Sequence, residues 1–122
     1  MAYQDILSAT ARALMTSRVS IWHYHAEQNC IECVAQFNNG IVELQQGLKL
    51  YQKDYAPYFE AILEEKVIVA DDARIHPATS VFTASYLKPL DIYSMLDVPY
   101  IENGRFQGVI CCEQQGEMRV WD

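Results

Sequence analysis

The fold is decided by residues 93–114, which read YSMLDVPYIENGRFQGVICCEQ. Two extended runs, Tyr93 to Ile101 and Arg105 to Gln114, are joined there through Glu102-Asn103-Gly104. Asn-Gly readily adopts the positive φ values of a type I′ turn, so the two runs are predicted to form a β-hairpin. Gly108, inside the second run, indicates a bulge or the close approach of another backbone.

A helix and another hairpin are predicted before this segment. From Tyr3 to Thr16 the apolar residues recur every three or four positions, as they do in an amphipathic helix. Arg18 to His25 (RVSIWHYH) is rich in β-branched and aromatic residues and reads as a strand with both faces covered. Cys30 to Phe37 (CIECVAQF) reads as its hairpin partner, which ends at Asn38-Asn39-Gly40.

The middle of the chain is predicted to hold loops, two helices and one short strand. Ile41 to Lys53 is less regular and reads as a loop that could include a short strand or turn. A helix is predicted from Asp54, as its cap, to about Lys66. Val67 to Ala70 reads as a strand. A second short helix is predicted to begin at Pro77 and to end before Pro89.

Length and composition indicate the class of protein. The 122 residues, 51% hydrophobic and 20% charged, suit one compact domain, so residues 1–122 are read as a single α+β domain with a largely antiparallel sheet. Sixteen acidic residues against nine basic ones give a net charge of -7, which disfavours nucleic acid as a partner. No apolar run approaches the ~20 residues of a membrane span, and no secretory signal pattern is present. We therefore expect a cytoplasmic domain with free thiols and no direct membrane insertion.

Three segments resemble the GAF family of cytoplasmic sensory domains, particularly those attached to bacterial histidine kinases and diguanylate cyclases. They are RVSIWHYH at Arg18 to His25, YAPYFEAILEEKVIVADDAR at Tyr55 to Arg74, and SYLKPLDIYSMLDVPYIENGRFQGVICCEQ at Ser85 to Gln114. The resemblance covers nearly the whole chain and implies a GAF-like (profilin-like) antiparallel sheet of five or six strands with helices on both faces. The connecting helices would form a ligand pocket on one face. This assignment requires the hairpin and the strand at Arg18 to His25 to share one sheet.

The end of the sequence departs from the family pattern. GAF domains usually close with a long helix after an Arg-any-Trp segment, whereas this sequence stops at Arg119-Val120-Trp121-Asp122. The closing helix is therefore expected to be absent, the sequence to be a fragment of a larger signalling protein, and the uncovered face to expose apolar surface. We expect a homodimer that forms through the helix at residues 3–16.

The histidines and cysteines do not form a convincing metal site. Zinc ligands could be drawn from His23, His25, Cys30 and Cys33. Residues three apart on a strand point to opposite faces, so Cys30 and Cys33 could not both face the histidines without a bulge or turn. Cys111 and Cys112 are adjacent, so their side chains should also diverge, with one of them in the core. We expect neither a metal site nor a redox pair.

Two activities known among GAF-fold proteins depend on sequence motifs that this sequence lacks. Some of these proteins reduce free methionine sulfoxide through cysteines around the pocket, but their pattern does not map onto the four cysteines here. Bilin-binding relatives anchor the chromophore through a cysteine followed by a histidine, whereas the comparable stretch here reads Thr79-Ser80-Val81-Phe82-Thr83. We therefore expect no covalently bound bilin and no catalytic residue. The resemblance implies a small-molecule ligand or cofactor, which it does not identify.

Asp97 is the most unusual residue, a carboxylate within the apolar strand Met95-Leu96-Asp97-Val98-Pro99. Burying it unpaired would cost several kcal/mol, so it must have a partner or a water molecule. One interpretation is a structural hydrogen bond or salt bridge. The other is that Asp97 lines the ligand pocket, because buried charges gather at functional sites. The sequence leaves both open.

The remaining candidates lie on the loop and short helix before the hairpin. Asp72 and Arg74 could bind a ligand, or they could instead take part in the bonding of a turn or helix cap, where Asp commonly satisfies backbone N–H groups. Phe82 and Tyr86 lie four residues apart on one helix face and could be core or a platform for a ligand. The candidate ligand-binding residues are Asp72, Arg74, Phe82, Tyr86, Met95 and Asp97.

The leading hypothesis is a regulatory small-molecule-binding module of a bacterial signal-transduction protein, which controls a linked catalytic output domain. The alternative is a dimerisation scaffold whose pocket is filled by its own large side chains: Tyr55, Phe59, Phe82 and Tyr86. A methionine sulfoxide reductase is a third hypothesis, but the domain is expected not to be an enzyme, because the sequence has no phosphate-binding glycine loop or nucleophile elbow. A cavity of roughly 300 Å³ or more would favour the binding module over the scaffold.

Overall fold

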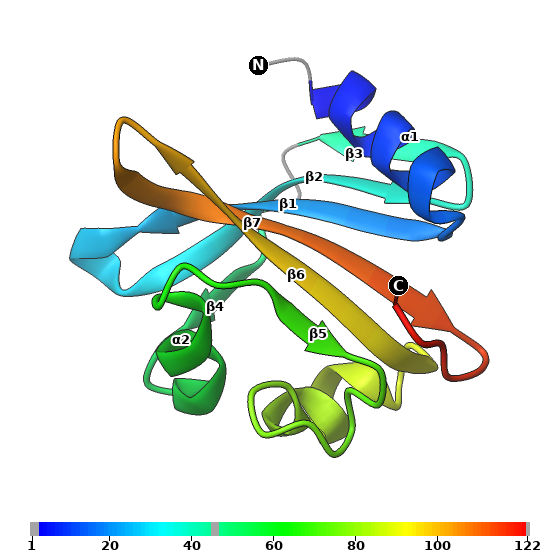
Figure 1. Cartoon of the computed structure of the whole chain (residues 1–122). Helices are drawn as coiled ribbons and strands as arrows, with labels where there is room; N and C mark the ends of the chain where they lie inside the picture. Colours follow the sequence, from blue (N-terminus) through cyan, green and yellow to red (C-terminus); the bar gives the residue numbers. More distant parts are fainter. Residues whose placement is uncertain (1–2, 45–46, 122) are drawn as a thin grey trace.

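The computed structural model describes residues 3–44 and 47–121 and forms one 7-stranded antiparallel sheet with helices on both faces (Figure 1). The strand order is β3-β2-β1-β7-β6-β5, and β4 also pairs with β2. β1 (Arg18–His25) pairs with β7 (Arg105–Gln115), and β7 pairs with β6 (Ile92–Glu102). The α+β, GAF-like fold is thus confirmed, including the shared sheet on which it depended. The sheet has more strands than the five or six predicted.

α1 (Tyr3–Leu14) packs across β1 and β2 on one face of the sheet (Figure 1). Its buried residues Leu7 and Ala11 form a core cluster with the strands beneath them. The helix ends before the predicted Thr16, because Met15 adopts a φ of 53° and the Thr16 N–H bonds to the carbonyl of Ala11 at 3.1 Å. This pattern is a Schellman motif, which stops a helix by satisfying its last carbonyls.

Two short strands occupy one edge of β2 (Cys30–Asn38). They are β3 (Ile41–Leu44) and β4 (Lys49–Tyr51). The prediction for Ile41 to Lys53 was a loop that could include a short strand, whereas the structure has two short strands there; residues 45–46 lie outside the described part of the chain. Strands of three or four residues are too short to show an alternating pattern, and here they form through backbone bonding to the edge of β2.

α2 (Ala56–Ile62) lies on the opposite face and stops short of the predicted end at Lys66. Its N-cap residue is Tyr55, which makes no capping bond through its side chain, so the predicted cap role of Asp54 was wrong. The helix ends because Glu65 adopts a φ of 61° and its N–H bonds to a carbonyl only three residues back, at 3.0 Å. This left-handed turn leads directly into the next strand.

β5 (Ile68–Ala70) forms the far edge of the sheet, and two short turns follow it. The helix predicted from Pro77 is not regular. It consists of a 3₁₀ turn, η2 (Ser80–Phe82), and a π turn, η3 (Thr83–Leu87). Both turns lie against the same side of the sheet as α2 (Figure 1). Together with α2 they form the second helical layer.

The β6–β7 hairpin contains the predicted type I′ turn. The φ values are 54° at Asn103 and 73° at Gly104. The predicted close approach at Gly108 is also present, because a Cβ there would lie 2.0 Å from the backbone oxygen of Trp22. No side chain fits at this position without moving the neighbouring strand.

The same hairpin contains the predicted bulge. Ile101 pairs with Phe106, but Tyr100 pairs with Gly108, so Gln107 is an extra residue without a partner on β6. From Gly108 to Gln114, each residue of β7 pairs one position later than a regular ladder from the turn would give, and a second irregularity between Ile92 and Ser94 restores the original register at Gln115. A shift of one position reverses the face of the sheet on which a partner lies, so the bulge decides which side chains meet.

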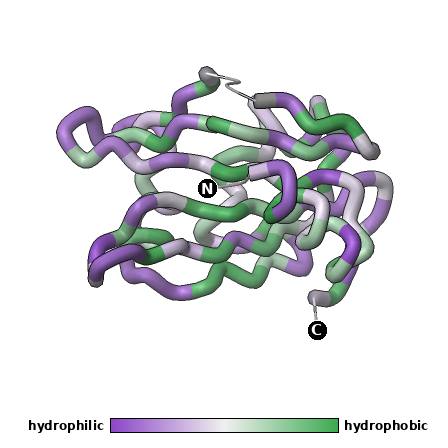
Figure 2. The backbone as a smooth tube through the Cα atoms, turned by 90° about the horizontal axis from the view of Figure 1, so that it is seen from above, coloured by the Kyte–Doolittle hydropathy of each residue, from purple (hydrophilic) through white to green (hydrophobic). Residues whose placement is uncertain are grey.

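The sheet separates two cores. The α1 side contains an apolar cluster of buried residues: Leu7, Ala11, Val19, Ile21, Ala35 and Cys112. The larger cluster on the other side includes Trp22, Phe59, Ile62, Phe82, Leu87 and Ile92. Hydrophobic residues recur along the strands between the two, while hydrophilic residues gather at loops (Figure 2). Over the described residues, no helix has both the length and the apolar character needed to cross a membrane.

Candidate functional site

A cavity of about 140 Å³ lies between the sheet and the layer formed by α2, η2 and η3. Its apolar wall comprises Trp22, Ile31, Leu48, Leu50, Phe82 and Met95. Its polar lining comprises Tyr55, Tyr58, Ser85, Tyr86, Asp97, Cys111 and Glu113. An apolar enclosure with a few convergent polar groups is the composition of a small-molecule site.

Aromatic rings pack together where the cavity meets the helical layer. Phe82, only 3% exposed, is at the centre of this group. Its ring centroid lies 4.7 Å from that of Tyr55, 5.1 Å from that of Tyr58 and 6.3 Å from that of Tyr86. These rings fill part of the space beneath the sheet, which is why the cavity is smaller than the roughly 300 Å³ typical of the smallest ligand sites.

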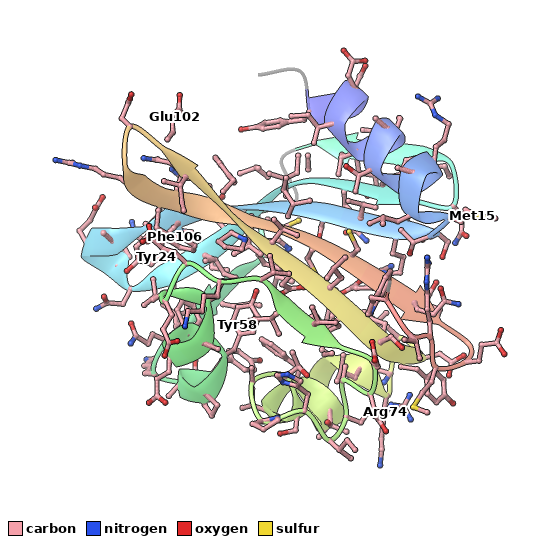
Figure 3. All side chains as sticks on the ribbon, in the orientation of Figure 1. Met15, Tyr24, Tyr58, Arg74, Glu102 and Phe106 are labelled. Carbon is pink, nitrogen blue, oxygen red and sulfur yellow. The ribbon has the colours of Figure 1, made fainter. Side chains whose placement is uncertain are left out.

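Asp97 lines the cavity and keeps one carboxylate oxygen without a partner. The residue is 1% exposed, and the hydroxyl of Tyr58, which lies between α2 and the sheet (Figure 3), donates to its Oδ2. Its Oδ1 is buried and has no hydrogen-bond partner among the described residues. Burial raises the pKa of Asp97 to about 7, while hydrogen bonds from Tyr58 and Cys111 oppose the rise and Glu113 adds to it. Asp97 therefore has both a structural partner and a place in the cavity wall.

Glu113 is held in a buried ion pair with Arg18. Nε of Arg18 donates to Oε1 at 2.8 Å, and the two side chains are 8% and 3% exposed. The hydroxyl of Tyr86 donates to Oε2 at 2.7 Å. Burial and the Glu113 carboxylate both raise the pKa of Tyr86, so this hydroxyl remains a donor. Burial alone would lower the pKa of Arg18, but Glu113 outweighs it and the net shift is upward. Glu113 is thus fully compensated.

The hairpin register brings these groups together. Asp97 pairs directly with Cys111, whose thiol also lies 3.7 Å from Oε2 of Glu113. A regular ladder counted from the turn would instead place Ile110, a residue of the α1 side, opposite Asp97. The extra residue Gln107 therefore aligns Asp97 with the polar face of β7.

Four of the six predicted ligand-binding residues line the cavity: Phe82, Tyr86, Met95 and Asp97. Asp72 and Arg74 do not, which corrects their expected placement. Oδ1 of Asp72 accepts a hydrogen bond from the Arg74 backbone N–H at 3.2 Å, the turn bonding that the sequence left open. Nε of Arg74 donates to the carbonyl of Ile92 at 3.1 Å, and its guanidinium lies 4.1 Å from the centroid of the Tyr93 ring. Figure 3 shows Arg74 at the periphery of the domain.

The sequence-based candidates omitted Tyr58, Arg18 and Glu113. Glu113 carried a usable signal, because it is a carboxylate in the apolar run GVICCE and lies two positions after Cys111, on the same face of the strand. Arg18 stands opposite Glu113 in the β1–β7 ladder, a pairing that only the assembled sheet reveals. Tyr58 had no comparable signal, because its role depends on how α2 lies against the sheet.

The four cysteines are free and buried: Cys30, Cys33, Cys111 and Cys112. Cys111 and Cys112 diverge as predicted, and both belong to a core, one on each side of the sheet. Burial raises the pKa of Cys33 to about 11, that of Cys112 to about 12 and that of Cys111 well above its usual range. These three thiols therefore stay protonated near neutral pH. In the part of the chain that the structure describes, His, Cys, Asp and Glu side chains form no group of three able to hold a metal.

The sequence pattern of the GAF domain matches residues 1–122, and the chain therefore belongs to the GAF domain family. No curated protein sequence matches it significantly. Among solved structures, the blue-light absorbing form of the PixJ GAF domain of Thermosynechococcus elongatus is similar with a TM-score of 0.77 and 17% identity. This match covers 98% of the present chain and 71% of that chain.

Two further structures are similar. The GAF domain of a two-component sensor histidine kinase from Bacillus halodurans has a TM-score of 0.68 and 18% identity, with 98% of this chain and 80% of that chain covered. A free methionine-R-sulfoxide reductase from Neisseria meningitidis, in complex with its substrate, has a TM-score of 0.65 and 14% identity, with 90% of this chain covered. The present chain spans 59% of the length of that reductase. At these identities the similarities show the fold alone.

Proposed function

We propose that this domain is a sensory and regulatory module of a bacterial signal-transduction protein, located in the cytoplasm. It binds a small molecule beneath the sheet and thereby controls a linked catalytic output domain such as a kinase or cyclase. The supporting observation is a cavity lined by Asp97, whose buried Oδ1 has no hydrogen-bond partner among the described residues, because such atoms are rare in proteins unless a partner completes them. The neighbouring sensor kinase and PixJ domains are consistent with this role.

The size of the cavity limits the ligand. Its volume of about 140 Å³ is comparable to the roughly 150 Å³ apolar cavity that takes up benzene in another protein. A molecule of about that size fits without rearrangement, whereas a tetrapyrrole does not. Because residues 79–83 also lack a cysteine and a histidine, a covalently bound bilin is not proposed.

Native mass spectrometry of gently purified protein tests this function. We expect the mass of the chain with a small adduct, and we expect the adduct to be lost in Ser85→Trp, because Ser85 is an exposed residue at the cavity where an indole can block entry. Ala84→Trp is the matched control, since Ala84 is exposed and does not line the cavity. A bare chain mass, together with no thermal shift in a screen of small metabolites, would contradict the proposal.

A dimerisation scaffold is the second candidate function. It is favoured by the aromatic packing around Phe82, which leaves a cavity below the roughly 300 Å³ expected of a ligand site.

Whether the domain is a binding module or a scaffold, we propose that two copies associate through the helix at residues 3–16. Its outward positions include the exposed residues Ala9 and Ala13, whose small side chains would allow another helix to approach closely.

Sedimentation equilibrium tests the dimer. We expect the wild-type chain to be dimeric and Ala9→Glu to be monomeric, because a buried carboxylate would oppose the contact. Ala26→Glu is the matched control, since Ala26 is exposed at a turn away from α1. A wild-type chain that remains monomeric at high concentration would exclude this contact.

We propose no catalytic role for the domain itself. A nucleophilic cysteine must reach the thiolate form, and burial opposes this at Cys33, Cys111 and Cys112. The experiment is an assay of the purified chain with free methionine sulfoxide and a dithiol reductant. We expect no turnover, and reduction above the rate of a heat-denatured sample would overturn this part of the proposal.

A further inference from the structure

Among the described residues, two carboxylates line the cavity, and only one of them has a cationic partner. Glu113 is paired with Arg18 at 2.8 Å. Asp97 accepts a hydrogen bond from the Tyr58 hydroxyl, while its Oδ1 has no partner in the described structure. The described residues that line the cavity include no lysine, arginine or histidine. A positive charge is therefore the complement that this site lacks.

The remaining wall suits a cation with an apolar body. Trp22, Tyr55 and Phe82 line the cavity, and aromatic rings attract a cation that lies within roughly 6 Å of their faces. Ile31 and Met95 add apolar surface. An anionic ligand would instead be placed beside an uncompensated carboxylate in a low-dielectric space.

We propose that the ligand of this cavity is a small amine, whose protonated nitrogen donates a hydrogen bond to Oδ1 of Asp97 and whose short apolar body lies against the aromatic wall. This inference rests on the proposed function and narrows it to one chemical class. The competing ligand is a neutral carbonyl compound, which would accept a hydrogen bond from the protonated form of Asp97. The two classes differ in the protonation state that they require, so pH separates them.

Burial raises the pKa of Asp97 to about 7, so a change of pH around neutrality changes the charge of this carboxyl. The titratable and charged groups around it come from α2, η3, β1 and β7: Tyr58, Tyr86, Arg18, Cys111 and Glu113. Burial raises the pKa of Tyr58, Tyr86 and Cys111, so these three stay protonated. The ion pair already satisfies Glu113. An amine would therefore bind the ionised form of Asp97 and displace its proton.

Isothermal titration calorimetry on the whole chain tests the inference with three probes of matched shape: n-butylammonium chloride, n-butanol and sodium butyrate. We expect saturable binding of the amine and much weaker binding of the other two. Affinity for the amine should rise about tenfold between pH 6 and pH 8, as does the ionised fraction of a carboxyl with a pKa of about 7. An alkylamine itself stays protonated over this range.

Asp97→Asn preserves shape and removes the charge. It should weaken amine binding at least tenfold at pH 8 and abolish the pH dependence, about the effect of losing a charge-assisted hydrogen bond. Glu102→Gln makes the same change in net charge at the exposed tip of the hairpin (Figure 3), away from the cavity, and should bind as the wild type does. The wild-type pH profile decides the question by itself if Asp97→Asn does not fold.

The outcomes distinguish this inference from the proposed function. Preferred binding of butanol or butyrate that Ser85→Trp blocks would overturn the amine assignment and leave small-molecule binding in place. An amine affinity that falls from pH 6 to pH 8 would also overturn it, because the protonated carboxyl would then be the binding form. If no probe binds and purified protein carries no adduct, both proposals fail.

Discussion

The two faces of the sheet differ in what they bury. The α1 face buries Leu7, Val19 and Ile21 in an apolar cluster. The other face buries Asp97 and the ion pair of Arg18 with Glu113 beside its aromatic residues. Burial of apolar area stabilises a fold at any pH, whereas buried charges make stability depend on each partner and on protonation. One face therefore supports the domain, and the other carries its chemistry.

The largest effect should come from removing the cation of the buried pair. Arg18→Met leaves Glu113 buried without its counter-charge, which should cost about 3–5 kcal/mol in the free energy of unfolding. Urea denaturation monitored by tryptophan fluorescence measures it. Arg105→Met, at an exposed position beside the hairpin turn, is the matched control and should change little. Equal stability of the two variants would show that the ion pair between Arg18 and Glu113 does not stabilise the folded domain.

Truncation on the α1 face should cost nearly as much but behave differently with pH. Leu7 is fully buried, so Leu7→Ala should lower the free energy of unfolding by about 3 kcal/mol, equally at pH 5 and pH 8. Ile41→Ala, at a residue that is 64% exposed, should be close to neutral. If the loss of unfolding free energy in Leu7→Ala varied strongly with pH, the two faces would not differ in pH dependence as we infer.

Asp97 should make stability fall as pH rises. Its pKa is about 7 in the folded state and about 3.9 in an unfolded chain. Between these values the folded state holds a proton that the unfolded state has released, so a higher pH favours unfolding. The contribution of Asp97 should decline by about 2–3 kcal/mol from pH 5 to pH 8 and then level off. Denaturation at several pH values should show this slope for the wild type, and a wild-type slope retained in Asp97→Asn would assign it to other groups.

The smallest effect compares two adjacent thiols. Cys112→Ser places a hydroxyl in the apolar α1-side cluster, where lack of a partner should cost about 1–2 kcal/mol. Cys111→Ser keeps a donor near Asp97 and Glu113 and should cost less than about 1 kcal/mol. Thermal unfolding of the two variants side by side measures the difference. A larger loss of stability for Cys111→Ser than for Cys112→Ser would mean that the Cys111 thiol, like that of Cys112, contributes as an apolar group.

Local chemistry explains why much of the fold could be predicted from the sequence. Asn103-Gly104 adopts the turn that its positive φ values favour, and Gly108 lies where no side chain fits. β1 has the predicted bounds, because alternation over eight residues leaves little ambiguity. The burial of Asp97 followed from a single charge in an apolar strand. Each of these features depends on a short segment of chain.

Features that depend on distant partners could not be predicted in this way. β3 and β4 exist because the edge of β2 binds them. Asp72 satisfies its own turn instead of reaching the cavity, a choice between two plausible partners that the sequence leaves open. Tyr58 meets Asp97 across 39 positions of sequence, so their contact depends on the packing of α2 against the sheet. The candidate site was thus predicted where it lies on β6, η2 and η3, and it was missed at Arg18, Tyr58 and Glu113, which other elements contribute.

The bulge at Gln107 makes one place in the hairpin tolerant of a change in chain length. Deleting Gln107 would join Phe106 directly to Gly108 and produce a regular ladder, since their partners Ile101 and Tyr100 are already consecutive. All later residues of β7 would keep their neighbours on β1 and β6. Deleting a residue beyond Gly108 would instead rotate the rest of the strand and turn its acidic side chain toward α1. Homologous chains that differ by one residue at this tip can therefore preserve the same interior.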